Sequence, residues 1–250
     1  MQRKIGIVVP CANPTVEPEI HKLVPSGYFP YVARFPSYPD SDLKERLTKY
    51  RSDLSQSIDT LKGLDLDGAL VACTGSSYPI GLSGDREWTD EASEQLGKPV
   101  VSAAGSVATV LKALSAKELV VVSPYPAWLT AEFSAFWISA GYKIVELVEI
   151  NKSGNIYDLT KSEMAKALSE AVSQSGGKRP NQVLLVAGTG VPSLEPIEEM
   201  ASLIEIPIVT SQIAGIWNLF SEMNKLDQIP NSKSAALNKL HNQILKSSNS

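Results

Sequence analysis

Short apolar runs rich in β-branched residues alternate along this chain with longer segments of helical periodicity. Eight runs have the length and composition of buried strands: residues 4–9, 31–35, 68–72, 99–102, 118–122, 143–148, 183–187 and 206–210. Segments in which apolar residues recur with helical spacing lie between them, at residues 43–61, 106–114, 127–140, 161–173 and 214–223. Strands that alternate with helices form mostly parallel sheets flanked by helices, so the predicted fold class is α/β.

The strand pattern is repeated within the chain. The segment KIGIVVP at residues 4–10 resembles ELVVVSP at residues 118–124. In the same order, ALVACTG at 69–75 resembles LLVAGTG at 184–190, and KPVVS at 98–102 resembles IPIVT at 206–210. Because the three matches share an offset of roughly 110 residues, we predict two pseudo-symmetric, Rossmann-like halves.

The repeat divides the chain into three parts. We expect a first α/β half at residues 1–115, a second at 116–220, and a C-terminal helix with a frayed tail at 221–250, where Ser, Asn and Lys are frequent. Loops that follow corresponding strands would then face each other across one cleft. Ligand sites commonly form at the carboxyl edges of parallel strands and between halves of a molecule, so we expect the site there.

Composition excludes several classes of site and partner. Lys plus Arg number 23 and Asp plus Glu 27, with no basic cluster, which argues against nucleic acid. No apolar run reaches the roughly 18 residues that span a bilayer, so we expect no membrane contact and a cytoplasmic location. With 2 cysteines and 2 histidines, neither a metal site nor a disulfide is expected. The sequence leaves open whether the chain forms a homo-oligomer.

Cys73 lies where a buried strand ends in the small polar loop Thr74-Gly75-Ser76-Ser77. Backbone N–H groups of such a loop favour thiolate over thiol, so we expect Cys73 to have a lowered pKa and to react faster than Cys11. The alternative is a small buried apolar residue, a common role of an intracellular cysteine. The corresponding loop of the second half, Gly188-Thr189-Gly190, has no sulfur.

The loop after the first strand has the sequence PCANPTVEPE at residues 10–19. Pro14 suits the first turn of a helix, whose free N–H groups attract a carboxylate. Asn13 either binds that carboxylate or caps the helix, and Cys11 either packs or reaches the cleft. The corresponding loop of the second half offers Tyr125, whose phenol either donates to the same carboxylate or belongs to the core.

Taken in order, these motifs resemble the aspartate/glutamate racemase superfamily and, within it, the branch of maleate cis-trans isomerase and arylmalonate decarboxylase. The likeness spans about residues 4–220. It rests on Pro10-x-x-Asn13-x-Thr15-x-Glu17-Pro18-Glu19, Ala72-Cys73-Thr74, Pro124-Tyr125, and Ser211-Gln212 with Trp217. The resemblance implies two α/β halves, no metal or organic cofactor, and chemistry at the carbon beside a carboxylate.

The resemblance also implies roles for individual residues. Cys73 would be the nucleophile or proton carrier. The residues expected to contact the substrate are Asn13, Thr74, Tyr125, Asn155, Gly188 and Thr189. Among them, Asn13 and Tyr125 would bind a carboxylate, Thr74 and Thr189 would stabilise an oxyanion, and Asn155 stands for the polar segment 151–158.

The expected function is a cofactor-independent, cysteine-dependent enzyme that acts at the α-carbon of a small dicarboxylate, as maleate isomerase does. Three alternatives remain: a single-thiol decarboxylase of malonates, a relative of the amino-acid or hydantoin racemases, and a non-catalytic carboxylate binder. The first loop resembles that of the isomerases. Gly188 stands where isomerases and racemases have a second cysteine, which favours the decarboxylase and disfavours a racemase.

Overall fold

Two four-stranded parallel sheets form the frame of the molecule. The computed structural model describes residues 2–150, 155–176, 179–201 and 204–248. The first sheet has the order β2-β1-β3-β4 and consists of β1 (Arg3–Val9), β2 (Tyr28–Arg34), β3 (Gly68–Val71) and β4 (Val100–Ser102). The second has the order β6-β5-β7-β8 and consists of β5 (Glu118–Ser123), β6 (Lys143–Glu149), β7 (Gln182–Val186) and β8 (Ile208–Thr210).

The identical strand orders confirm the predicted α/β fold with two similar halves. Each predicted strand is present, with ends that differ by a few residues. The central strands β3 and β7 are buried along their whole length. In the sequence these strands are nearly continuous apolar runs, because a parallel strand that is covered by helices on both faces of its sheet has no polar face.

Nine helices belong to the described residues: α1 (Val16–Leu23), α2 (Leu43–Asp59), α3 (Gly81–Leu96), α4 (Ala103–Ala113), α5 (Ala127–Ser139), α6 (Lys161–Gln174), α7 (Leu194–Met200), α8 (Ser211–Glu222) and α9 (Ala235–Ser248). The sequence predicted neither α3 nor the short helix α7. The buried face of α3 carries Asp85 and Thr89 beside Ala92, so its apolar periodicity is weak. At the C-terminus, α9 extends to Ser248 and buries Leu237 and Leu240.

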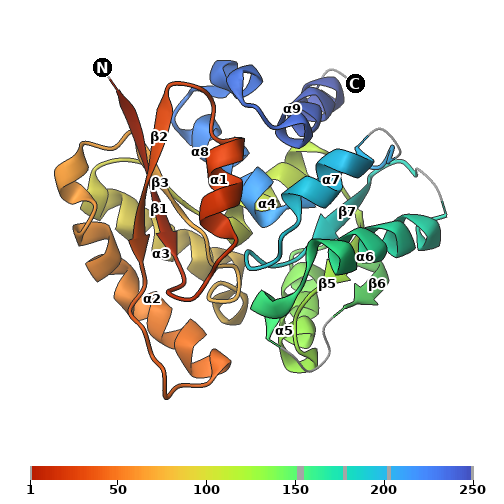
Figure 1. The fold of residues 1–250 in the computed structure, drawn as a ribbon, viewed down its shortest axis with the longest axis horizontal. Coiled ribbons are helices and arrows are strands. Elements are labelled where there is room, and N and C mark those ends of the chain that lie inside the picture. Colours follow the sequence, from red (N-terminus) through yellow and green to blue (C-terminus); the bar gives the residue numbers. More distant parts are fainter. Residues whose placement is uncertain (1, 151–154, 177–178, 202–203, 249–250) are drawn as a thin grey trace.

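The two halves lie side by side and share packing through α4 and α8, which lie between them (Figure 1). Although α8 follows the last strand of the second sheet, it packs against β3 and β4 of the first sheet and against α4. In return, α4 contacts β8. This exchange of contacts fixes the edge of one sheet relative to the other. None of the described helices has the length and apolar character needed to cross a membrane.

A buried carboxylate joins the first half to the second. Glu19 of α1 accepts hydrogen bonds from the backbone N–H groups of Ser193 and Leu194, at 2.7 and 2.8 Å, at the start of α7. Burial raises the pKa of Glu19 to about 7, although both N–H donors and Lys22 lower it. The carboxyl group therefore keeps its proton in the folded protein at a pH where the unfolded chain has lost it.

We expect Glu19 to make the protein less stable as the pH rises from about 5 to about 7. In this range the folded state binds more protons than the unfolded state, so the free energy of unfolding falls by up to about 1.4 kcal/mol per pH unit. Below about pH 4.5 both states are protonated and the contribution is constant. Glu19→Gln keeps an oxygen acceptor and should flatten this slope in urea denaturation. Equal slopes for variant and wild type would refute this account.

Candidate active site

The loops that follow four strands meet in one cavity between the halves. β1 pairs with β3 and β5 pairs with β7, so the loops after each pair emerge at the same edge of their sheet. The hydrogen bonds between the strands end in the same way in both pairs: Ala72 N–H donates to Val8 O, and Ala187 N–H donates to Val122 O. Cys11, Cys73, Tyr125 and Thr189 from these loops line a cavity of about 50 Å³.

The rest of the lining comes mainly from two helical segments that cover the loops. α2 contributes Leu43, Arg46, Leu47 and Tyr50. The short 3-10 helix η3 (Ile156–Asp158) contributes Ile156 and Tyr157, and α5 contributes Leu129. A water molecule needs about 10–15 Å³ on this measure, so the space holds a few waters or one small ligand.

A larger hollow, of about 730 Å³, lies beside α3, β4 and α4. Its lining includes Asp85, Ser102 and Asn218 but no cysteine, tyrosine or histidine. It is also open along the edge of the first sheet. We place the candidate active site in the smaller cavity because thiols, hydroxyl groups and a guanidinium line it together.

Cys73 is buried, and its thiol contacts the Ser76 hydroxyl at 3.3 Å. Burial raises the pKa of the Cys73 thiol, whereas hydrogen bonds from the Ser76 side chain and from the backbone of Ser76 and Gly75 lower it. The loop donors predicted from the sequence are therefore present. The predicted net lowering of the pKa is wrong, because loss of solvent outweighs the donors.

This environment reverses the expected order of alkylation. Iodoacetamide reacts with thiolates that it can reach; Cys73 is buried and its pKa is raised, while Cys11 is half-buried. We expect Cys11 to be labelled first near neutral pH, as measured by peptide mass spectrometry, and Cys73 labelling to accelerate as the pH is raised. Faster labelling of Cys73 than of Cys11 at neutral pH would contradict this assignment.

Tyr125 presents a neutral phenol to the cavity. Its hydroxyl is 2.9 Å from the Thr74 hydroxyl and 2.9 Å from the Tyr78 hydroxyl. Burial raises the pKa of Tyr125 to about 12, although hydrogen bonds with Thr74 and Tyr78 lower it. At neutral pH the group is therefore protonated, so its hydroxyl can donate a hydrogen bond but cannot accept a proton as a base.

Gly188 gives the Tyr125 ring its space. Its φ is +84°, and a Cβ at this position would lie 3.2 Å from both Cε1 and the hydroxyl oxygen of Tyr125. A side chain here would be strained by the backbone conformation and would push against the phenol. The second half therefore presents Tyr125 and Thr189 to the cavity and contributes no thiol.

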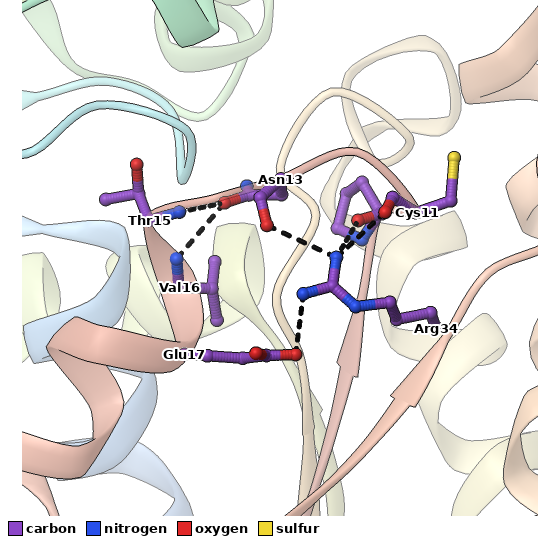
Figure 2. A network of polar contacts seen from close by, with 7 residues as sticks. Cys11, Asn13, Thr15, Val16, Glu17 and Arg34 are labelled. Atoms are coloured by element: carbon purple, nitrogen blue, oxygen red, sulfur yellow. Dashed lines mark hydrogen bonds and ion pairs between the residues drawn. The ribbon is translucent and has the colours of Figure 1, made fainter.

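Asn13 is buried and makes its contacts within the protein. Its Oδ1 accepts from the N–H groups of Thr15 and Val16 at the start of α1, at 2.9 and 3.1 Å (Figure 2). Its Nδ2 donates to the Thr189 hydroxyl at 3.2 Å. Asn13 therefore caps a helix and orients a cavity residue of the other half, and it does not line the cavity itself.

The structure does not bring Asn155 into the cavity. This side chain is exposed and caps η3 by accepting from Tyr157 N–H at 3.2 Å. Tyr157 reaches the cavity in its place, because Gly190 leaves room for the ring: a Cβ on Gly190 would lie 2.6 Å from Tyr157 Cε1. Residues 151–154 of the predicted polar segment lie outside the described residues.

Arg34 fixes the loop that carries Cys11. Its guanidinium donates to the carbonyl oxygens of Pro10, Cys11 and Asn13 and pairs with Glu17 at 2.7 Å (Figure 2). The Cys11 sulfur points away from this network and lies 3.6 Å from the Tyr50 hydroxyl. Two thiols of the first half thus line the same cavity.

Arg46, Tyr50 and Tyr157 were not predicted as site residues. A signal for the first two exists in the sequence: residues 43, 46, 47 and 50 follow the spacing of one helix face. An arginine within an otherwise apolar face is unusual and indicates a partner or a ligand there. Tyr157 lies in the segment 151–158 that the resemblance singled out, two residues beyond Asn155.

Comparisons with known proteins agree on this architecture. The family model for arylmalonate decarboxylase matches residues 5–237. The maleate isomerase of Geobacillus stearothermophilus is 23% identical over 243 residues, which cover 92% of this chain and 96% of that protein.

Two solved structures have the same fold. The maleate isomerase Iso of Pseudomonas putida S16 superimposes with a TM-score of 0.80 at 19% identity, over 94% of this chain and 99% of that one. A cysteine-to-serine variant of the Nocardia farcinica maleate cis-trans isomerase, with a covalently bound succinylcysteine intermediate, superimposes with a TM-score of 0.76 at 21% identity, over 89% and 93%.

Proposed function

Because this chain belongs to the arylmalonate decarboxylase family, we propose that it is a cysteine-dependent enzyme that isomerises a small cis-unsaturated dicarboxylate such as maleate. The observation that carries the proposal is the position of Cys73 in a cavity lined by neutral hydroxyl donors and one guanidinium. The maleate isomerases among its relatives, and the succinylcysteine in one of them, support it.

Isomerisation requires the carbon–carbon double bond to be broken for a time. In the proposed reaction, the Cys73 thiolate forms a bond to one olefinic carbon. The π electrons move to the other olefinic carbon and into the carboxylate beside it. The remaining single bond rotates, the electron pair re-forms the double bond, and the thiolate leaves. If that carbon takes a proton instead, the product is a succinyl adduct, which must lose the proton before the thiolate leaves.

The hydroxyl groups would stabilise the charge that develops in this step. Thr74 and Tyr125 are hydrogen-bonded to each other, and Asn13 holds Thr189, so the donors are fixed before a ligand arrives. Preorganised donors in a site shielded from water contribute several kcal/mol to a transition state. The raised pKa of Tyr125 keeps its proton available for donation.

A malonate decarboxylase is the second candidate, and the raised pKa of Cys73 favours it. In that reaction a carbon–carboxylate bond breaks, carbon dioxide leaves, and the electron pair spreads into the remaining carboxylate. The neutral Cys73 thiol then protonates the carbon and regains a proton from water. Activity would fall as the thiol ionises, whereas the isomerase needs the thiolate and should gain about tenfold in kcat/KM per pH unit between about pH 7 and about pH 9.

Turnover assays separate the candidates. Incubation with maleate, followed by proton NMR, should give fumarate. If maleate is inert and α-methyl-α-phenylmalonate releases carbon dioxide to give 2-phenylpropionate of one handedness, the decarboxylase replaces the isomerase. If both are inert while succinate raises the melting temperature, the protein is a carboxylate binder.

A further inference from the structure

Arg46 is the only charged residue among the described residues that line the active-site cavity. It belongs to α2, where it lies one helical turn from both Leu43 and Tyr50, which also face the cavity. The hydroxyl donors Thr74, Tyr125 and Thr189 come from loops after strands, so the guanidinium belongs to a separate wall.

Arg46 forms no ion pair with a carboxylate of the described residues. Arg34 differs in this respect, because its guanidinium pairs with Glu17 and donates hydrogen bonds to three carbonyl groups. A guanidinium that lines a cavity without an acidic partner suits a planar, bidentate anion such as a carboxylate.

The surroundings of Arg46 strengthen its attraction for an anion. The side chain is half-buried, and its neighbours in the lining include Leu43 and Leu47. Fewer water molecules screen a charge in such a wall than on an open surface. Its field also reaches across to the second half, where it counteracts the rise that burial causes in the pKa of Tyr157.

We propose that Arg46 binds the second carboxylate of the substrate and thereby selects dianions. This proposal rests on the proposed function. The carboxylate that takes up charge during the reaction lies against Thr74, Tyr125 and Thr189, and Arg46 holds the carboxylate attached to the carbon that Cys73 attacks. Because that second carboxylate is charged in ground state and transition state alike, Arg46 acts mainly on binding.

The test compares maleate with maleamate, in which one carboxylate is replaced by an amide of nearly the same shape. Arg46→Gln should raise KM for maleate about 10- to 100-fold, the loss of one charge-assisted interaction, while kcat changes by less than about fivefold. KM for maleamate should stay within about threefold of the wild-type value, and Arg46→Lys should fall between wild type and Arg46→Gln.

Lys49→Gln is the matched control. Lys49 lies on the same helix and carries the same charge, but it is bound to the Ser41 hydroxyl and lies over the Tyr38 ring, outside the cavity. It should leave both KM values unchanged. An unchanged KM for maleate in Arg46→Gln, or equal increases for maleate and maleamate, would overturn the proposal.

A binding measurement keeps this test separate from the test of the reaction. If the wild type turns over neither compound, the isomerase proposal fails, and calorimetry with succinate and its monoamide succinamate then tests Arg46 alone. Tighter binding of succinate that is lost in Arg46→Gln supports the assignment of Arg46. Equal binding of both ligands by wild type and variant refutes it.

Discussion

Replacing Cys73 with alanine should lower kcat/KM for maleate at least about 100-fold. Rotation about a double bond needs a nucleophile that adds to carbon and leaves again, and Cys73 is the buried thiol at the end of β3 that reaches the cavity. Steady-state rates measured by NMR would show the loss. A Cys73→Ser variant keeps a hydroxyl near Ser76 and separates the loss of nucleophilicity from the loss of volume.

The stability of these variants must be measured beside their activity. Removing a buried sulfur leaves a small cavity and costs about 1 kcal/mol or more, so melting temperatures show whether the variant is folded. Cys11→Ser tests the other thiol of the cavity and should reduce activity far less than Cys73→Ala. Near wild-type turnover by folded Cys73→Ala would remove the thiol from the mechanism.

Replacing Tyr125 with phenylalanine should lower kcat about 100-fold. The substitution removes the hydroxyl group that we propose to donate to the anion, and the loss of one such donor typically costs about 10²- to 10³-fold in kcat. The ring remains, so its packing against Phe133 and against Gly188 is kept. Single-turnover rates would show that the chemical step, and not substrate release, is slowed.

Tyr78→Phe is the matched control for this prediction. Tyr78 is also buried and hydrogen-bonded to the Tyr125 hydroxyl, but it does not line the cavity. Its replacement removes the same kind of phenol from the same network and should lower kcat less than about tenfold. Equal losses in the two variants would mean that the network matters for stability and that Tyr125 is no direct donor.

The sequence predicted the parts of the site that depend on local pattern. Apolar runs mark buried strands, and polar residues directly after them mark the loops at the carboxyl edge of each sheet. This pattern marks Cys73 and Tyr125 as candidates, and the family resemblance adds Thr74 and Thr189; all four line the cavity. The internal repeat was sufficient to predict two halves with one topology.

The parts that depend on packing could not be read in this way. The sign of the pKa change of Cys73 depends on how completely neighbouring elements exclude water from it. The positions of Arg46 and Tyr157 depend on how α2 and η3 fold over the strand ends. The sequence allows Asn13 either to cap a helix or to bind a ligand. Its hydrogen bonds to the start of α1 and to Thr189 depend on how the two halves pack together.

The most direct test of the central claim is mass spectrometry of the intact protein, acid-quenched during turnover of maleate. The account predicts a fraction of protein that is heavier by one molecule of maleic acid, with the added group on the peptide that contains Cys73. The group should be absent from Cys73→Ser. Turnover of maleate with the adduct on Cys11, or with Cys73 unmodified at every quench time, would contradict the account.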